Sequence, residues 1–534
     1  MIRDDLATAL RVALAELGVD APESIHMEQP AHREHGDWSS NVALASAKGA
    51  GRKPRELAQQ LADAVDAARP AHVMSVEVAG PGFVNFRLAS TWLHDVLAEV
   101  VAAGVDGYAR PDVGNGRKVM VEFVSANPTG PLHAGHARGA AYGDSLARIL
   151  ERTGHDVARE FYINDRGVQM AKFGESIAAA AAGRPVPEDG YRGRYIAEWA
   201  AGLPEGDDPT EFGYRRALAD QREVLAAFGI EFDVWFSERS MIDNGAIEQT
   251  LADLRDRGAV EDRDGAVWLR ASEFGAGEDR VLVKSTGDPA YLLPDLAYHR
   301  DKLVRGFDLL IDVWGADHHD HVQRVRAGLV ALGYDPDRFE VAIIQLVKLM
   351  RDGVEVKISK RTGDIIELRD LIDEVGTDAT RFTYLLQSVD SKQTVDLGLI
   401  VSKTMDNPVF YVQMAHARLC SLDRVAAERG LRRGELADAD LSLLTHEREL
   451  EVLRGLFDLP FVIELAARER APHKVTTWLR ESAGAVHGFY HDCPILHPDV
   501  SDELRQARWW LADASQVGLR IGLSLLGVSA PESM

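Results

Sequence analysis

Two histidines lie three residues apart in the stretch Ser125–Asp144, which reads SANPTGPLHAGHARGAAYGD. His133 and His136 fall on one face of the first turn of a predicted helix. A helix N-terminus offers unpaired N–H groups and a partial positive charge, which suits phosphate. Gly135 leaves room for a flat purine ring against the backbone. The pattern favours nucleotide binding, although two capping or surface histidines without a ligand would have the same spacing.

A basic run occurs further along the chain, in VKISKRTGDIIEL at positions 356–368. Lys357 and Lys360 flank Ser359, and Arg361 and Gly363 follow. Such a loop on an otherwise acidic chain suits a clamp on a polyphosphate. A solvated basic loop is the alternative interpretation of this run alone. The histidine loop upstream favours the clamp.

The elements around these loops are expected to form one parallel sheet. Residues 118–125 (KVMVEFVS) are predicted as a buried strand, followed by a loop, a helix and a second strand in DVAREFYIND. Two further strands are predicted in FDLLIDVWGADHH and FEVAIIQLVKL. Strands joined in this way make right-handed crossovers, and the ligand binds beyond their carboxyl ends. The fold class is α/β, with a Rossmann-like, doubly wound catalytic domain.

The 534 residues are too many for one compact core, and three domains are expected. Residues 1–108 combine helical periodicity with alternating strands, which predicts an α+β domain. Residues 109–367 form the Rossmann-like domain, interrupted by an insertion at about 165–285. Residues 368–534 have apolar positions at helical spacing and predict an all-α bundle.

The composition limits the class of protein. Two isolated cysteines, Cys420 and Cys493, argue for a reducing compartment and against structural zinc. Neither a signal peptide nor a membrane-spanning run is found, so a cytoplasmic protein without membrane contact is expected. The formal net charge of −24 argues against non-specific coating of nucleic acid, but it leaves room for a local basic surface.

The two signatures together resemble those of class I aminoacyl-tRNA synthetases. HAGH is similar to their HIGH motif, and KISKR to their KMSKS motif, with Ile358 in place of Met and Arg361 in place of the last Ser. The flanks VEFVSANPTGPLHAGHARGA, FYINDRGVQM, GDPAYLLPDLAYHRDK, NPVFYVQMAHARL and LLGVSAPESM resemble arginyl-tRNA synthetases, over nearly the whole chain.

The resemblance implies a reaction of ATP with L-arginine to arginyl-adenylate, followed by transfer to the terminal adenosine of tRNA(Arg). The implied partners are ATP with Mg²⁺, L-arginine and tRNA(Arg), and a monomer is expected. His133 and His136 would donate hydrogen bonds to the phosphates, and Lys357 and Lys360 would hold the pyrophosphate. The ATP-binding set is His133, Gly135, His136, Lys357, Ser359 and Lys360. The family also implies that arginine activation needs bound tRNA.

Selection of arginine requires carboxylates and an aromatic face for its guanidinium group. Glu122 and Asp295 are the candidate carboxylates and Tyr291 the candidate ring. The resemblance adds Asn127 as a contact of the substrate's α-amino or carboxylate group, and it places Asp317 and His318 at the pocket. A paired structural acid is the alternative for Glu122, and plain packing is the alternative for Tyr291. The histidines of WGADHHDH are expected to be solvated, and no metal site is predicted.

Single-stranded RNA loops are read by stacking on aromatic rings and by contacts with Arg, which suits the basic start of the C-terminal bundle. The candidate tRNA-binding residues are Tyr411, Arg418, Arg424 and Arg432, with a solvated Arg-rich helix as the alternative. The N-terminal domain would contact tRNA by resemblance. Two other functions are the alternatives. One is another class I synthetase or a nucleotidyltransferase, but small nucleotidyltransferases lack the long C-terminal bundle. The other is a non-catalytic RNA-binding relative, which would be expected to lose one of the four signature residues, and all four are present.

Overall fold

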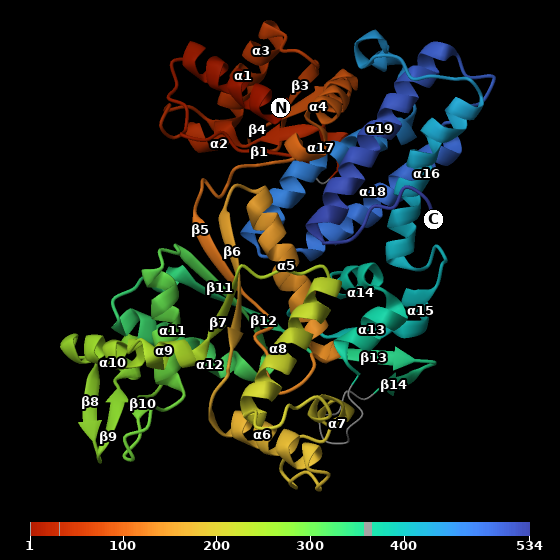
Figure 1. Ribbon diagram of the computed structural model, residues 1–534. Coiled ribbons are helices and arrows are strands. Elements are labelled where there is room, and N and C mark those ends of the chain that lie inside the picture. The colour runs from red at the N-terminus through yellow and green to blue at the C-terminus, as the bar shows by residue number, and fades with distance from the viewer. Residues whose placement is uncertain (1, 31, 357–365) are drawn as a thin grey trace. The chain divides into compact units, whose positions relative to one another are not determined.

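The computed structural model describes residues 2–30, 32–356 and 366–534, and the chain divides into two compact units. The first unit comprises Met1–Gly104, Asp423–Phe457 and Ala485–Val517. The second comprises Val105–Leu422, Asp458–Gly484 and Gly518–Met534. Figure 1 shows the elements of both along the chain. Lys357, Ser359 and Lys360 lie outside the described residues.

The N-terminal part of the first unit is an antiparallel sheet covered by helices. The sheet has the order β1 (Met27–Glu28), β2 (Trp38–Ser40), β4 (Phe83–Leu88) and β3 (Val73–Ala79). The helices are α1 (Ile2–Glu16), α2 (Val42–Ser46) and α3 (Pro54–Ala68). Pro54 opens α3 at a position where no N–H is needed. Helix α4 (Thr91–Gly107) then leaves the unit through a kink at Gly104, whose φ is 61°. The expected α+β character of this region is confirmed.

A five-stranded parallel sheet is the centre of the second unit. Its order is β12 (Phe339–Ile344), β11 (Leu309–Gly315), β5 (Lys118–Glu122), β6 (Asp156–Ile163) and β7 (Val234–Ser237). The first strand, β5, lies between β6 and β11, so the winding direction reverses there, as it does in Rossmann folds. The connecting helices include α5 (Ala137–Arg152), α11 (Leu292–Val304) and α12 (His319–Ala331). The Rossmann-like prediction is confirmed.

Two details of this sheet differ from the expectation. The segment FEVAIIQLVKL is two strands, because the chain leaves the parallel sheet after Ile344 and enters a second sheet at Val347. That second sheet has the order β14 (Val354–Val356), β13 (Val347–Arg351) and β15 (Gln393–Asp396). The range expected as an insertion also contributes β7 to the parallel sheet.

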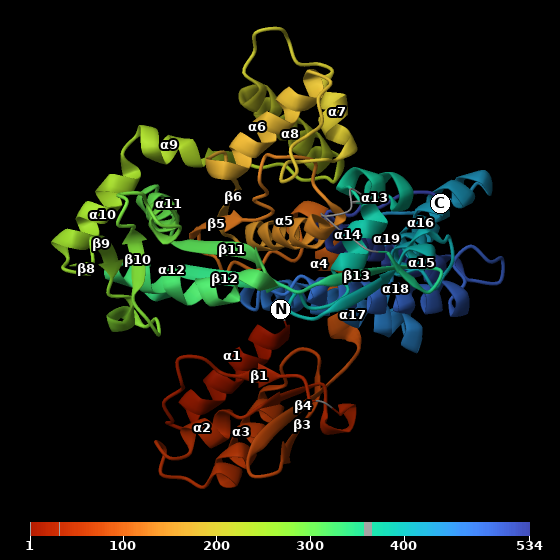
Figure 2. The ribbon, with the colours of Figure 1, turned by 90° about the horizontal axis from the view of Figure 1, so that it is seen from below.

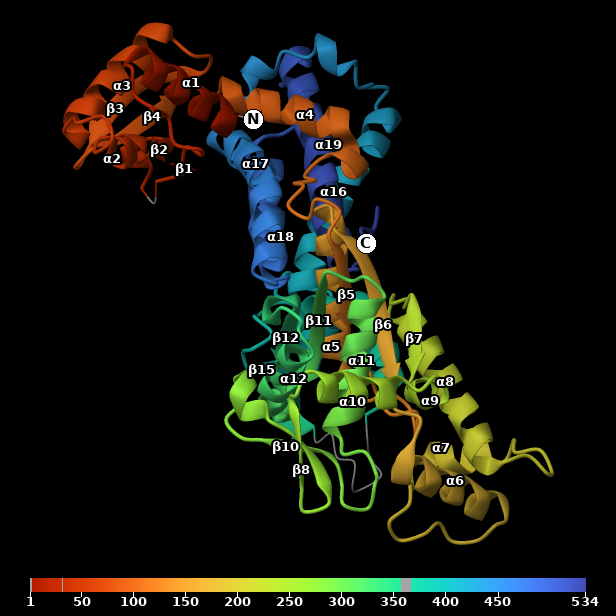
Figure 3. The ribbon, with the colours of Figure 1, turned by 90° about the vertical axis from the view of Figure 1, so that its left-hand side faces the viewer.

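Two excursions extend from the parallel sheet. The first packs three helices around Phe173 and Trp199, and Figure 2 shows them together: α6 (Gly167–Ala181), α7 (Arg194–Ala200) and α8 (Pro209–Ala227). The second precedes α11 and ends in a small antiparallel sheet (Figure 3). It contains α9 (Glu238–Asp243), α10 (Ala246–Asp256), β8 (Val260–Arg263), β9 (Ala266–Leu269) and β10 (Arg280–Val283).

The chain after Glu367 is helical apart from β15. The helices are α13 (Leu368–Val375), α14 (Thr377–Tyr384), α15 (Leu397–Val401), α16 (Pro408–Glu428), α17 (Glu447–Arg468), α18 (His473–Asp492) and α19 (Asp502–Leu525). This agrees with the predicted helical C-terminal region. No helix among the described residues is long and apolar enough to cross a membrane.

Candidate active site

A buried cluster of charges lies where β5 and β11 end. Glu122 of β5 and Asp312 of β11 are partners in register, and the Nζ atom of Lys302 lies 2.5 Å from Glu122 Oε2 and 3.0 Å from Asp312 Oδ1. All three side chains are buried. Glu122 Oε1 also accepts a hydrogen bond of 2.8 Å from Ser125 Oγ. Both oxygens of Glu122, a predicted arginine ligand, therefore already accept hydrogen bonds within the protein.

His299 extends this cluster toward the surface. Its Nε2 lies 2.7 Å from Asp312 Oδ2, and its Nδ1 lies 2.8 Å from the backbone oxygen of Asp295. Burial would lower the pKa of His299, but Asp312 and Asp295 outweigh it and raise that pKa to about 10. Burial likewise opposes ionisation of Asp312, yet Lys302 and His299 lower its pKa.

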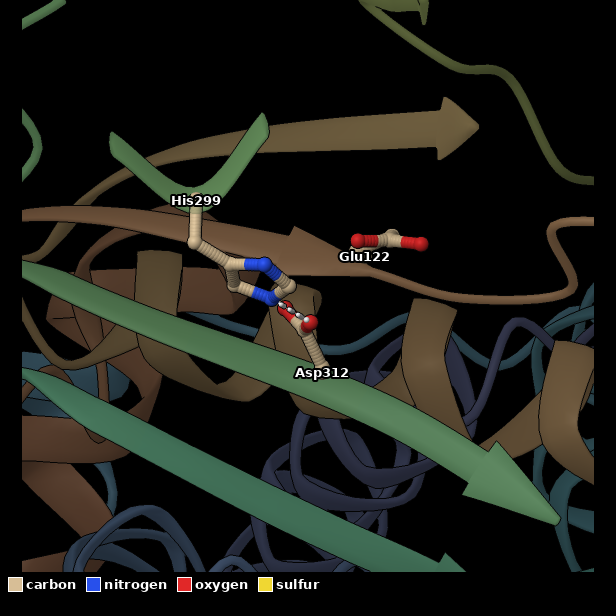
Figure 4. Close-up of side chains that lie close together, drawn as sticks. All are labelled: Glu122, His299 and Asp312. Carbon is tan, nitrogen blue, oxygen red and sulfur yellow. Dashed lines mark hydrogen bonds and ion pairs between the residues drawn. The ribbon is translucent and has the colours of Figure 1, made fainter. Parts of the chain in front are cut away.

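Glu122, His299 and Asp312 come together in Figure 4, and their ligand atoms lie within 4.8 Å of one another. Three such groups have the donor types of a metal site. However, the ammonium group of Lys302 contacts both carboxylates, and it supplies the positive charge that a cation would bring. The cluster is therefore suited to an internal ion network and not to a metal.

Asp295, in the first turn of α11, is the candidate carboxylate that remains partly accessible. Its side chain is 24% exposed, its Oδ2 lies 2.5 Å from His321 Nε2, and its Oδ1 lies 3.3 Å from His299 Nδ1. Burial opposes ionisation of Asp295, but His299 and His321 hold its pKa well below the usual range. Tyr291 stands at the start of the same helix and is 84% exposed.

Three acidic side chains act on the same tyrosine ring. Burial raises the pKa of Tyr162 on β6, and the charges of Glu238, Asp295 and Glu122 raise it further. Glu238 follows directly after β7, and Tyr162 precedes the last residue of β6. Glu122 at the end of β5, Glu238 after β7 and Asp295 in α11 thus all influence the ionisation of one tyrosine of β6. Neither Glu238 nor Tyr162 was expected from the sequence.

The other predicted arginine ligands have separate surroundings. Asn127 is exposed, and its amide donates to Gln169 Oε1 at 2.7 Å. Asp317 and His318 are exposed in a short 3₁₀ turn after β11, with 3.7 Å between Asp317 Oδ2 and His318 Nε2. The contact with Asp295 comes instead from His321, in α12. His321 was expected to be solvated, and this expectation is wrong, because α12 turns the side chain toward α11.

The two histidines of the HAGH stretch form a reciprocal cap on the 3₁₀ turn Ala134–His136 that leads into α5. His133 Nδ1 accepts from the Gly135 N–H at 3.1 Å, and His136 Nδ1 accepts from the His133 N–H at 3.2 Å. Their ring centroids are 3.8 Å apart. A Cβ atom on Gly135 would lie 2.8 Å from His133 Nδ1, so glycine makes room for the histidine ring.

The segment after the basic run is joined to the histidine loop. The Ala134 N–H donates to Ile366 O at 2.9 Å, and the Leu368 N–H donates to Leu132 O at 2.7 Å. His133 and Glu367 thereby form an isolated antiparallel bridge. The described residues that directly follow the basic run are therefore fixed against the loop that carries the histidines.

The candidate tRNA-binding residues are placed on or just after α16. Tyr411 and Arg418 are half-buried, whereas Arg424 and Arg432 are exposed. Their neighbour Arg433 is structural, because its guanidinium pairs with Asp513 Oδ1 at 2.7 Å and lies 4.1 Å from the centre of the Trp510 ring. Arg424 and Arg432 are therefore accessible from solvent, as a residue that contacts RNA must be.

Three family models match the chain. Residues 4–88 match the arginyl tRNA synthetase N terminal domain, and residues 412–534 match the DALR anticodon binding domain. Residues 99–181 and 201–406 match the catalytic domain of class I tRNA synthetases (R).

Proteins of similar sequence match over their full length. Arginine--tRNA ligase from Frankia alni is 47% identical, with 99% of each chain covered. Arginine--tRNA ligase from Bacillus subtilis is 42% identical and covers 100% of this chain and 99% of its own. Among solved structures, the arginyl-tRNA synthetase of Thermus thermophilus covers both chains fully, with a TM-score of 0.76 and 23% identity. A putative arginyl-tRNA synthetase of Campylobacter jejuni has the same TM-score of 0.76, with 29% identity, and covers 84% of this chain and 100% of its own.

Proposed function

The chain belongs to the arginyl-tRNA synthetase family of class I, and from this premise we propose that it is an arginine–tRNA ligase. It activates L-arginine with ATP to arginyl-adenylate, releases pyrophosphate, and transfers the arginine to the 3′-terminal adenosine of tRNA(Arg). The observation that supports this most directly is Asp295, a partly accessible carboxylate of α11 that His299 and His321 hold at 3.3 and 2.5 Å. A cationic side chain is the substrate group that such a carboxylate selects.

The ATP site is assigned to the histidine loop and the basic run. His133 and His136 donate to the phosphates from the mouth of α5, where the helix dipole adds positive charge. Gly135 and Ser359 complete the contacts, and Lys357 and Lys360 hold the departing pyrophosphate. Catalysis is then mostly positioning and charge neutralisation in an in-line displacement at the α-phosphate.

Mg²⁺ enters this proposal with ATP. Among the described residues, the one group of three possible metal ligands already holds the ammonium of Lys302. Mg²⁺ prefers to keep several waters and to bind through substrate phosphates, so this chain needs no cage of its own for the ion. The ion would neutralise phosphate charge as the pyrophosphate leaves.

The arginine site is assigned to Asp295 and Tyr291, with Glu122 behind them. Asp295 is held ionised and partly accessible, which suits a charge-assisted bond to a guanidinium group. The exposed ring of Tyr291 can lie against the planar group. Asn127 lies on an exposed loop and is proposed as a contact of the α-amino or carboxylate group. Asp317 and His318, exposed after β11, are proposed to close the arginine pocket.

Tyr411, Arg418, Arg424 and Arg432 are proposed to contact tRNA, because arginines beside an aromatic ring suit an unpaired anticodon loop. The proposed catalytic and binding groups come from one chain, so a monomer suffices for the reaction. The proposed location is the cytoplasm, where the tRNA substrate is used.

The test is pyrophosphate exchange with each amino acid, with and without tRNA(Arg). Exchange is expected with arginine only, and only when tRNA is present. Replacing Lys360 by Ala should slow adenylate formation and leave the affinity for tRNA nearly unchanged. Exchange driven by a different amino acid would refute the assignment. Equal losses of exchange and tRNA affinity in Lys360→Ala would make the basic run a tRNA-binding surface.

A further inference from the structure

His299 has hydrogen-bond acceptors at both ring nitrogens. Nε2 lies 2.7 Å from Asp312 Oδ2, while Nδ1 lies 2.8 Å from the backbone oxygen of Asp295 and 3.3 Å from its Oδ1. A neutral imidazole carries one N–H, so it would set a lone pair against one of these oxygens. Two donors are needed, and the imidazolium form supplies them.

The surroundings of His299 come from five elements. Asp312 lies on β11 and Glu122 on β5, and Lys302, Asp295 and the Tyr298 ring are on the same helix, α11. The Phe339 ring of β12 packs edge-on against the imidazole, and His321 of α12 contacts Asp295. Lys302 and His299 are thus two buried cations that both contact Asp312, and Lys302 also contacts Glu122, whose pKa is raised by burial. A buried charge needs a partner of opposite sign, so neither cation is dispensable.

Asp295 is the point where this network reaches the proposed arginine pocket. Its two oxygens each have one histidine neighbour, His299 on Oδ1 and His321 on Oδ2. Each carboxylate oxygen has a second lone pair, and the side chain is 24% exposed. Both oxygens are therefore held in one orientation and can still accept from a two-pronged donor.

Resting on the proposed function, we propose that His299 is a positioning residue for arginine. Its imidazolium joins Asp312 in the core to Asp295 in the pocket, and it fixes the carboxylate that receives the guanidinium. His299 does not touch the substrate. His299 and His321 impose one orientation on the Asp295 carboxylate. The amino acid that binds best is then the one whose side chain ends in a planar group with two hydrogen-bond donors that fit this orientation.

Two substitutions separate the two bonds of His299. In His299→Asn, the amide can replace Nδ1, which keeps the donor to Asp295 and loses the one to Asp312. In His299→Gln, the longer amide can replace Nε2, which keeps the donor to Asp312 and loses the one to Asp295. A hydrogen bond to a charged group is worth enough to change binding about tenfold. We expect the KM for arginine to rise about tenfold in His299→Gln and less in His299→Asn.

The assay is pyrophosphate exchange by the full-length enzyme with saturating tRNA(Arg), with the KM for arginine and the KM for ATP measured separately. The KM for ATP should not change in either variant. The matched control is Tyr298→Phe, which removes a bond of 2.6 Å to Glu160 from the adjacent position of the same helix. This control should lower stability and leave the KM for arginine unchanged.

Parallel rises in both KM values, or an unchanged KM for arginine in folded His299→Gln, would overturn the proposal. Failure of the unaltered enzyme to activate arginine would instead refute the proposed function. Should the variants not fold, the ring nitrogens of His299 are followed by NMR in the unaltered protein. Protonation of both nitrogens at pH 8 is expected, and a ring that titrates near the usual range of histidine would contradict the imidazolium assignment.

Discussion

At the scale of single residues, the histidine cap determines which nitrogens can face ATP. In both rings Nδ1 accepts a backbone N–H, so the proton of a neutral ring must lie on Nε2. Both histidines are then fixed as Nε2–H donors without being charged. The phosphate contacts proposed above follow from this tautomer, because a helix mouth that supplies backbone donors gains two more from the side chains.

Replacing His136 by Gln or by Asn should separate the cap from the phosphate contact. Gln places an amide donor near the position of Nε2 but loses the cap, whereas Asn keeps an acceptor near Nδ1 and loses the donor. We expect His136→Asn to lower kcat of pyrophosphate exchange about 100-fold or more and His136→Gln to lower it less. The free energy of unfolding should show the reverse order, with a cap loss of about 1 kcal/mol in His136→Gln. If His136→Asn were more active than His136→Gln, the nitrogen of His136 that contacts the phosphate would be Nδ1 and not Nε2.

The protonation of His299 predicts how stability depends on pH. The folded chain raises the pKa of His299 from 6.5 to about 10, so the folded state holds a proton that the unfolded state has lost between these values. The contribution of this group is complete below pH 6.5 and disappears as the pH rises through about 10. Between pH 7 and 9 the free energy of unfolding should fall as the pH rises. Its slope should be steeper than that of His299→Gln by about 1.4 kcal/mol per pH unit. Denaturant titrations at several pH values measure this slope, and equal slopes would contradict a charged His299.

At the scale of elements, Arg138 joins the helix of the histidines to the sheet that leads into the basic run. Its guanidinium is fully buried at the start of α5 and donates to three backbone oxygens. These are Gln345 at 3.0 Å, just before β13, and Ser388 and Ser391 at 2.8 and 2.7 Å, just before β15. Strand β14 pairs with β13 and ends at Val356, so this side chain links α5 to the sheet whose last described residue precedes the basic run.

Arg138→Lys should therefore disturb ATP more than arginine. A lysine ammonium cannot reproduce the fork that reaches three carbonyl oxygens, and a buried polar group left unpaired costs about 1–3 kcal/mol. We expect a lower free energy of unfolding, a KM for ATP raised about tenfold, and an unchanged KM for arginine. The matched control is Arg305→Lys, because Arg305 directly follows α11 and pairs with Glu160 of β6, away from the link made by Arg138. A raised KM for arginine of equal size would show that the whole site, and not the link between signatures, had been displaced.

Strands and helices were predicted best where the apolar residues that they bury form one run within the element itself. The strands at 118–122, 156–163 and 309–315 were predicted because their apolar runs are bounded by turns. The break between β12 and β13 was not, because Gln345 is held by Arg138 from a helix about 200 residues away. The short β7 was assigned to an insertion because four residues carry little periodicity.

The candidate site shows the same division. The histidine loop was predicted because its residues are adjacent in the sequence, but the network of Lys302, Asp312 and His299 was not. A local signal existed, because Asp295, His299 and Lys302 recur at helical spacing on one face, and Asp312 interrupts an apolar strand. Only the register between β5 and β11 brings Glu122 to Asp312, and register is a property of the folded sheet.

At the scale of the whole molecule, the first unit is assembled from three separate segments of the chain. Residues of the N-terminal segment pack on the second segment: the Trp38 and Trp92 rings meet Phe457 edge-on, with centroids 6.0 and 4.7 Å away. His94 Nε2 also lies 3.3 Å from the backbone oxygen of Leu444. Of the proposed tRNA contacts, Arg424 and Arg432 belong to this unit. Tyr411 and Arg418 belong to the other unit, together with Asp295 and the histidine loop.

Phe457→Ala should consequently weaken tRNA binding without touching arginine selection. Truncating a buried Phe costs about 3–5 kcal/mol, and Phe457 is the ring that both tryptophans pack against. The first unit should unfold at lower denaturant, followed by the fluorescence of Trp38 and Trp92. In pyrophosphate exchange the KM for tRNA(Arg) should rise, while kcat at saturating tRNA and the KM for arginine stay unchanged.

The control is Phe173→Ala, which opens a comparable cavity among the helices α6, α7 and α8 of the second unit. It should leave the unfolding transition of the first unit unchanged. If Phe457→Ala raised the KM for arginine as much as the KM for tRNA, the first unit would have to act on the arginine pocket as well as on tRNA.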